Sequence, residues 1–262
     1  MPSDSRFDTI NVLITGGRRV GADLARRLAA RNANVAMTYN TSRDAIERTT
    51  TALQDEFGVK AVAVQADLSD PDQAQNAVDA TISAFGRIDA LVNMASIFPR
   101  TPFETLKPAD FDRNIAANLA GPYHTAVAVG QAMLKQSPGK DGFKGRIVNF
   151  GDWALDRPYR DYLPYLVAKG GLKTMTLALA AELAPHVTVN MIQPAMIDPP
   201  PDMTADDIAQ VIAATPLRRV GSPADVNELI LYLLYATSFV TGTCIRVDGG
   251  RFLNDGGPTE RV

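Results

Sequence analysis

Seven short runs of branched and aliphatic residues recur along the chain, and segments long enough to form amphipathic helices separate most of them. The runs read TINVLIT, NVAMTY, AVAVQADL, DALVNMA, GRIVNF, VTVNMI and TCIRVDGG. Strands that alternate with helices need crossover connections, so they assemble into a parallel sheet covered by helices on both faces. The pattern therefore predicts an α/β fold with a doubly wound parallel sheet of about seven strands.

One domain accounts for the whole chain of 262 residues. With 46% hydrophobic and 21% charged residues, the chain can bury one sizeable core. We expect a single domain over residues 1–262, with its core at about 9–252 and loosely ordered ends at 1–8 and 255–262.

Charge and composition exclude several classes of partner. A formal net charge of −3 argues against nucleic-acid binding, and no apolar stretch approaches the roughly 18 residues that span a bilayer. The single cysteine, Cys244, rules out an intrachain disulfide, and neither His124 nor His186 has neighbours that suggest a metal site. We expect a cytoplasmic protein that binds a small molecule, with no metal, membrane or nucleic-acid partner.

The segment VLITGGRRVGADLARRL combines a strand, a glycine-containing turn and the start of a helix. This arrangement exposes backbone N–H groups and the positive end of a helix to a phosphate. Glycines at such a place often serve only the turn, so this signal is weak alone.

The end of the next strand indicates which dinucleotide would bind. A site for NAD usually carries an acid about 20 residues after the turn, but here the chain reads TYNTSRD, with Thr41 and Ser42 at that place. Hydroxyl groups together with Arg18, Arg19 and Arg43 suit a 2′-phosphate, so we expect NADP(H). The alternative is that these arginines are solvated surface residues.

A tyrosine and a lysine four residues apart, Tyr165 and Lys169, can lie on one side of a helix. They occur together with TGGRRVG, the ADL of residues 66–68, the NMAS of residues 93–96, Asn118 in NLAGP, VNMIQP and VDGG. In order and spacing these motifs resemble the short-chain dehydrogenase/reductase family, from about Asn11 to Gly250.

The resemblance implies a Rossmann-like fold, a homotetramer and a reductase. Tyr165 would protonate the heteroatom of a C=O or C=N bond that receives a hydride, and Asn118 would link Lys169 to a water relay. Lys169 would lower the pKa of Tyr165, for which two pH units require about 2.7 kcal/mol. The residues implied to bind the cofactor are Gly16, Arg18, Arg19, Val20, Gly21, Tyr39, Asn40, Thr41, Ser42, Asp67, Leu68, Asn93, Ala95, Ser96, Tyr165, Lys169, Pro194 and Ile197.

Asp152 stands 13 residues before Tyr165, where most relatives carry a serine that binds the substrate carbonyl. An aspartate there resembles the pteridine reductase branch, in which it joins the tyrosine in a proton relay to a pterin ring. Two more residues match the same branch. Arg19 stands where ordinary relatives have a glycine, and Phe98 stands at the position of the aromatic residue that stacks on the pterin. The implied substrate-binding residues are Arg19, Ser96, Phe98, Asp152, Tyr162 and Tyr165.

Departures from the family pattern keep three hypotheses open. The turn has four residues between Gly16 and Gly21 instead of five, Met94 replaces an asparagine, and Ala195 replaces a glycine. The first hypothesis is an NADPH-dependent reductase of a pterin-like heterocycle, and the second is a reductase of 3-oxoacyl thioesters or other carbonyl compounds. The third is a non-catalytic NADP-binding scaffold or sensor, for which the short turn is the best argument.

Overall fold

A seven-stranded sheet, in which every neighbouring pair of strands is parallel, forms the centre of the molecule. The computed structural model describes residues 9–199 and 203–253, so the ends expected to be loose, 1–8 and 255–262, lie outside the described residues. The strands are β1 (Asn11–Thr15), β2 (Asn34–Tyr39), β3 (Ala61–Gln65), β4 (Ala90–Asn93), β5 (Gly145–Phe150), β6 (Val187–Pro194) and β7 (Cys244–Val247). The predicted doubly wound sheet is confirmed.

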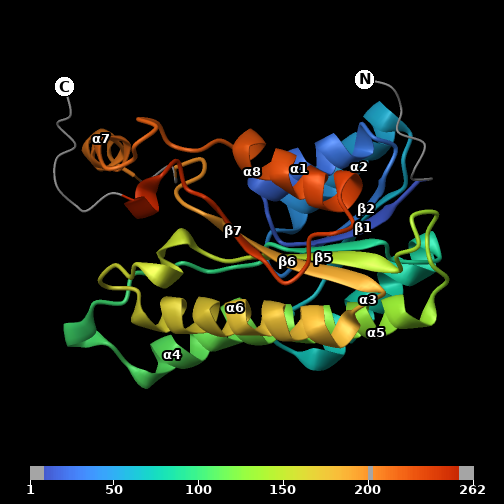
Figure 1. Cartoon of the computed structure of the whole chain (residues 1–262), viewed down its shortest axis with the longest axis horizontal. Helices are drawn as coiled ribbons and strands as arrows, with labels where there is room; N and C mark the ends of the chain where they lie inside the picture. The colour runs from blue at the N-terminus through green and yellow to red at the C-terminus, as the bar shows by residue number, and fades with distance from the viewer. Residues whose placement is uncertain (1–8, 200–202, 254–262) are drawn as a thin grey trace.

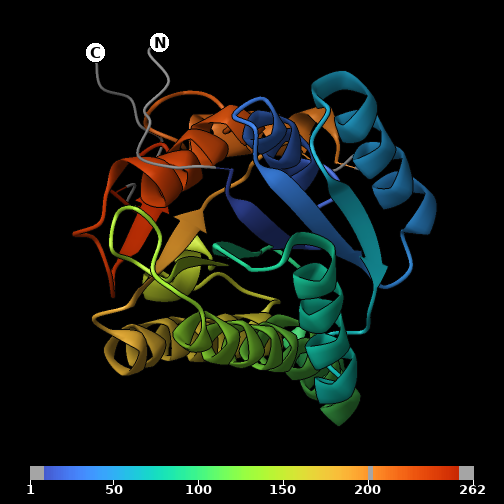
Figure 2. The ribbon, with the colours of Figure 1, turned by 90° about the vertical axis from the view of Figure 1, so that its right-hand side faces the viewer.

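Helices cover both faces of this sheet (Figures 1 and 2). Helices α1, α2 and α8 pack on one face, and α3, α5 and α6 pack on the other. The helices are α1 (Val20–Ala29), α2 (Arg43–Phe57), α3 (Pro71–Phe85), α4 (Pro108–Ile115), α5 (Gly121–Lys135), α6 (Leu163–Leu183), α7 (Ala205–Ala213) and α8 (Pro223–Leu231). Within the described ranges, no helix is both long and apolar enough to cross a membrane.

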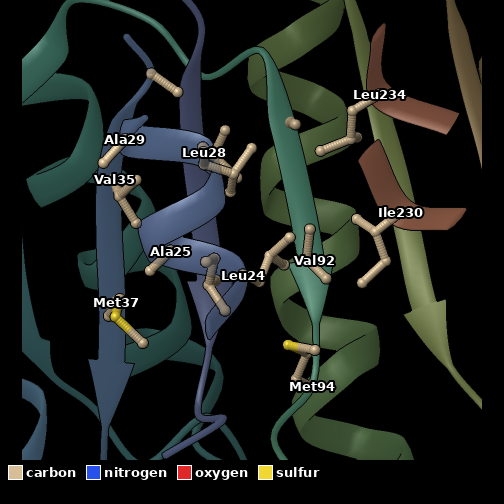
Figure 3. Close-up of a cluster of buried hydrophobic side chains, with 14 of the residues drawn as sticks. Leu24, Ala25, Leu28, Ala29, Val35, Met37, Val92, Met94, Ile230 and Leu234 are labelled. Atoms are coloured by element: carbon tan, nitrogen blue, oxygen red, sulfur yellow. The ribbon is translucent and has the colours of Figure 1, made fainter. Parts of the chain in front are cut away.

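The core beneath α1 shows why this segment is helical. Leu24 and Leu28 recur at four-residue spacing and are fully buried, and they face β2 and β4 as Figure 3 shows. Ile230 of α8 completes the same cluster. The one-sided apolar pattern therefore fixes α1, and with it the turn that precedes α1, against the sheet.

The order of the strands is β3-β2-β1-β4-β5-β6-β7. The direction of winding reverses between β1 and β4, and their carboxyl ends carry the glycine turn on one side and residues 94–98 on the other. Open parallel sheets bind ligands at such a switch point. The fold thus brings the turn and the NMAS motif together at one edge.

Candidate active site

The glycine turn after β1 has a backbone conformation that favours glycine. Gly16 and Gly17 have φ angles of +63° and +81°, and a Cβ on Gly16 would lie 2.9 Å from the Cα of Ala95. The N–H of Gly16 donates to the carbonyl of Thr38 at 3.2 Å, and α1 begins at Val20. The start of α1 is therefore anchored at the edge of the sheet, where its N–H groups suit a phosphate.

A cleft of about 570 Å³ opens beside this turn, along the carboxyl ends of β1, β2 and β4. Twelve of the residues predicted to bind the cofactor line it: Gly16, Arg18, Arg19, Val20, Tyr39, Asn40, Thr41, Ser42, Asp67, Leu68, Ala95 and Ser96. Ile97 and Phe150 also line the cleft and connect it to the region of Tyr165. The dimensions and the donors suit an extended dinucleotide.

The other residues predicted to bind the cofactor lie outside the wall of this cleft. Gly21 packs behind the turn, where a Cβ would lie 3.3 Å from the carbonyl oxygen of Gly16. Pro194 ends β6, and Ile197 lines a second cavity of about 290 Å³ near the end of β7. Tyr165 and Lys169 belong to α6.

Asn93 is 2% exposed, and its hydrogen bonds run into the core. Its amide donates to Asn149 at 2.9 Å, and its carbonyl oxygen accepts from the hydroxyl of Thr15 at 3.4 Å. Asn149 in turn donates to Thr176 of α6 at 3.0 Å. The side chain of Asn93 therefore joins β1, β4 and β5 to the helix of Tyr165, and its contact with the cofactor stays a prediction.

Three arginines were predicted to hold a 2′-phosphate. Arg18 is exposed at the cleft, whereas Arg43 forms an ion pair with Glu47 at 2.9 Å on the surface of α2. Arg19 donates to the carbonyl oxygen of Asp198 at 2.7 Å and lies 3.5 Å from its carboxylate. Arg18 and the hydroxyls after β2 are thus the groups best placed for a phosphate in this structure.

Asp152 and Tyr165 lie in direct contact. Asp152 follows β5, caps the 3₁₀ turn Trp153–Asp156, and accepts a hydrogen bond from the N–H of Ala154 at 2.8 Å. The hydroxyl of Tyr165, in the first turn of α6, donates to Oδ2 of Asp152 at 3.0 Å. Burial raises the pKa of Asp152, whereas the hydrogen bonds that its carboxylate accepts act in the opposite direction.

Lys169 lies one turn further along α6 and is 2% exposed. Its ammonium group donates to the carbonyl oxygen of Phe150 at 2.7 Å and lies 5.8 Å from the ring centroid of Tyr165. Burial lowers the pKa of Lys169 to about 8, and the charge of Asp152 opposes this change.

The pKa of Tyr165 differs from the prediction. Burial, and then the negative charge of Asp152, raise it well above the ordinary value for tyrosine, whereas we expected Lys169 to lower it. The ammonium group of Lys169 bonds Phe150 instead of the phenol, so its effect is smaller than that of burial and of the carboxylate. Tyr165 therefore stays protonated, which suits a proton donor and not a resting phenolate.

Asn118 lies fully buried in the π-helical turn Ala116–Ala120. Its carbonyl oxygen accepts from the hydroxyl of Ser96 at 2.7 Å, and its amide donates to the carbonyl of Ile97 at 3.1 Å. Within the described residues its side chain thus fixes the loop after β4, and Lys169 bonds elsewhere. The link between Asn118 and Lys169 that the family resemblance implies stays a prediction.

Phe98, the predicted stacking platform, is 52% exposed but already stacked. Its ring lies parallel to that of Tyr162, with centroids 4.2 Å apart and an interplanar angle of 10°. It also meets the ring of Tyr165 edge-on at 4.7 Å. One face of Phe98 is therefore covered by Tyr162, which leaves only the opposite face for a substrate.

Tyr159 is a residue that the sequence analysis missed. Its hydroxyl donates to Oδ2 of Asp152 at 3.2 Å, the same oxygen that accepts from Tyr165. The only signal in the sequence is its place in the aromatic segment between Asp152 and Tyr165. The described residues contain no cluster of histidine, cysteine and acidic side chains that suits a metal ion.

A family profile described as "Enoyl-(Acyl carrier protein) reductase" matches residues 17–251 of this chain. Solved structures similar over nearly the whole chain include a short-chain type dehydrogenase/reductase from Mycobacterium ulcerans, with a TM-score of 0.86 and 26% identity over 95% of this chain and 91% of that one. A dehydrogenase/reductase from Sinorhizobium meliloti has a TM-score of 0.85 and 30% identity, over 95% of this chain and 97% of that one.

The chain belongs to the short-chain dehydrogenase/reductase family. A similar member of this family is the 3-oxoacyl-[acyl-carrier-protein] reductase of Synechocystis sp., 34% identical over 91% of this chain and 95% of that protein. The short-chain reductase protein NovJ of Streptomyces niveus is 32% identical over 91% of this chain and 92% of that protein. Membership makes the chain an oxidoreductase, whereas resemblance to the pteridine reductase branch in particular rests on Asp152, Arg19 and Phe98.

Proposed function

We propose that this short-chain dehydrogenase/reductase uses NADPH to reduce a C=O or C=N bond, with Asp152 and Tyr165 as the proton relay. The hydrogen bond of 3.0 Å between these two side chains carries the proposal. Lys169 lies one turn away, and its partner Phe150 lines the cleft beside the glycine turn. Lys169 is thus hydrogen-bonded to a residue in the wall of the cleft that suits a dinucleotide.

NADP(H) fits the residues along this cleft. When bound, it would supply a hydride. A Cβ on Gly16 would lie 2.9 Å from the Cα of Ala95, so only glycine allows the turn to pack this closely against the loop after β4. Arg18, Thr41 and Ser42 line the cleft where a 2′-phosphate needs positive charge and donors. No carboxylate stands at the end of β2 to bind a ribose diol or to repel that phosphate.

The chain's own groups would move the proton. When Asp152 is protonated, the hydrogen bond reverses and the carboxyl O–H donates to the phenol oxygen of Tyr165. Tyr165 then gives its hydroxyl proton to the substrate heteroatom as negative charge develops there, and Asp152 passes its own proton to the phenol oxygen. Burial makes Asp152 hold a proton more tightly than an exposed aspartate does, which suits this role. In each turnover the substrate carbon receives one hydride and the heteroatom receives one proton, and Asp152 is then reprotonated from solvent.

A carbonyl compound, such as a 3-oxoacyl thioester, is the first candidate substrate. Curated relatives include proteins named 3-oxoacyl-[acyl-carrier-protein] reductase, and the matching profile carries a related description. Ile97, beside the cleft, adds apolar surface that suits an acyl group. A charged Asp152 would repel a developing oxyanion, so this reaction needs a protonated Asp152.

A pterin or a similar flat heterocycle is the second candidate, and it is favoured by Asp152. Protonation of a ring nitrogen suits a carboxyl group that acts through Tyr165. Arg19 lines the cleft, and the rings of Phe98 and Tyr165 meet edge-on at 4.7 Å. The stack of Phe98 on Tyr162 means that this ring would serve as one wall and not as an open platform.

A substrate panel followed by the absorbance of NADPH tests these readings. We expect turnover with 3-oxoacyl thioesters or small ketones, a weaker rate with NADH, and loss of turnover in Tyr165→Phe. Higher turnover with dihydrobiopterin, dihydrofolate or biopterin would favour the second candidate. If calorimetry shows NADPH binding but no compound is reduced, the non-catalytic scaffold or sensor replaces both. The homotetramer and the cytoplasmic location stay predictions.

A further inference from the structure

Two phenols donate to the same oxygen of Asp152. Tyr165 donates to Oδ2 at 3.0 Å and Tyr159 at 3.2 Å, while the N–H of Ala154 donates to Oδ1 at 2.8 Å. A carboxylate oxygen has two lone pairs, so these phenols fill the acceptor capacity of Oδ2. Only one of the two, Tyr165, belongs to the motif of the family.

The ring of Tyr159 is held so that its hydroxyl reaches Asp152. It meets Tyr162 edge-on at 5.2 Å, Phe98 edge-on at 6.2 Å, and Trp153 at 6.2 Å with a tilt of 39°. Such aromatic contacts fix a ring on three sides and leave the hydroxyl as the end that needs a partner. The bond to Asp152 is therefore a product of the whole aromatic cluster.

We propose that Tyr159 is a positioning residue that acts through Asp152: its hydroxyl stabilises the carboxylate and holds Oδ2 in line with the hydroxyl of Tyr165. This inference rests on the proposed function, in which Asp152 serves Tyr165. It adds a second phenol that decides at which pH the carboxyl group carries its proton.

The groups that face Asp152 support this assignment. From α6 these are the phenol of Tyr165 and the ammonium group of Lys169, from the capped turn the N–H of Ala154, and from the following loop Tyr159. Lys169 donates to Phe150, so its effect on Asp152 is through space. Burial favours the neutral carboxyl group, and hydrogen bonds to the charged form oppose burial.

Tyr159→Phe tests the inference because it keeps the ring and removes only the hydroxyl. Loss of one hydrogen bond to a charged group should raise the proton affinity of Asp152 about tenfold. One limb of the wild-type pH–rate profile reports the titration of Asp152 and should be absent in Asp152→Asn. In Tyr159→Phe we expect the midpoint of this limb to lie about one pH unit higher than in the wild type. The control Tyr123→Phe removes an exposed phenol on α5 that contacts only the ring of His124 among aromatic side chains of the described residues, and should leave rate and profile unchanged.

A direct titration makes the result independent of turnover. The protonated carboxyl group of Asp152 has an infrared C=O band, which can be identified in ¹³C-aspartate-labelled protein because Asp152→Asn lacks it. The change of this band with pH gives the midpoint of the Asp152 titration without any substrate. A higher midpoint in Tyr159→Phe than in the wild type, at equal melting temperature, supports the inference, and equal midpoints overturn it. If the wild type reduces no substrate, the proposed function fails, while this titration still decides the role of Tyr159.

Discussion

Replacing Lys169 by methionine removes a buried ammonium group and should change how the free energy of unfolding depends on pH. Lys169 is 2% exposed in the folded protein, and burial lowers its pKa from 10.5 to about 8. Each pH unit between the folded and unfolded pKa values corresponds to about 1.4 kcal/mol, so the gap corresponds to about 3.5 kcal/mol.

The sign follows from where the proton binds. Below pH 8 Lys169 is protonated in both states, and the folded protein bears the full cost of the buried charge. Between pH 8 and 10.5 the folded protein has released this proton while the unfolded chain still holds it, so the free energy of unfolding rises with pH. Methionine has a similar length and no proton to release, so Lys169→Met lacks this rise.

Urea denaturation at pH 7 and pH 10 measures the effect. Relative to Lys169→Met, the wild type should gain about 2.5 kcal/mol of unfolding free energy between these pH values. Lys60→Met, at an exposed position before β3, is the matched control and should follow the wild type. If the difference between wild type and Lys169→Met is the same at both pH values, the assignment of a destabilised buried ammonium group is wrong.

Two further substitutions test the cofactor cleft. Thr41→Asp places a carboxylate where we expect the 2′-phosphate, so the KM for NADPH should rise at least about tenfold while that for NADH does not, and Thr41→Asn should have little effect. Gly16→Val adds a branched side chain at φ +63° and 2.9 Å from the Cα of Ala95, and should abolish NADPH binding in calorimetry. Gly58→Val has a similar φ of +68° with open space around it, so it should lower stability and retain binding; loss of binding in both would contradict the phosphate-turn assignment.

Much of the fold follows from local patterns. Strand runs, the amphipathic face of α1 and the glycine turn are properties of short segments, and parallel pairing then brings their carboxyl ends to one edge. For the same reason the residues that directly follow β1, β2 and β4 line one cleft. The relation between Asp152 and Tyr165 was predicted from the family resemblance, in which the residue 13 positions before the tyrosine reaches the same site, and the hydrogen bond of 3.0 Å agrees with it.

The remaining features depend on packing between distant segments. Arg19 bonds the carbonyl of Asp198, 179 residues away, and no sequence pattern marks that contact. Phe98 stacks on Tyr162 only because the loop after β4 and the loop after β5 fold over each other. Tyr159 lies only seven residues from Asp152, but its contact depends on how that irregular loop folds back, which no periodic pattern reveals. The direction in which the pKa of Tyr165 shifts likewise depends on burial, and the spacing of residues along a helix does not reveal burial.

Single-turnover reduction, with NADPH mixed with the best substrate of the panel across the pH range, tests the Asp152–Tyr165 relay most directly. The account predicts that Asp152→Asn slows the step by about 10²–10⁴-fold and removes one limb of the wild-type pH profile. Equal rates and equal pH profiles in the two proteins would show that Tyr165 receives its proton from another group.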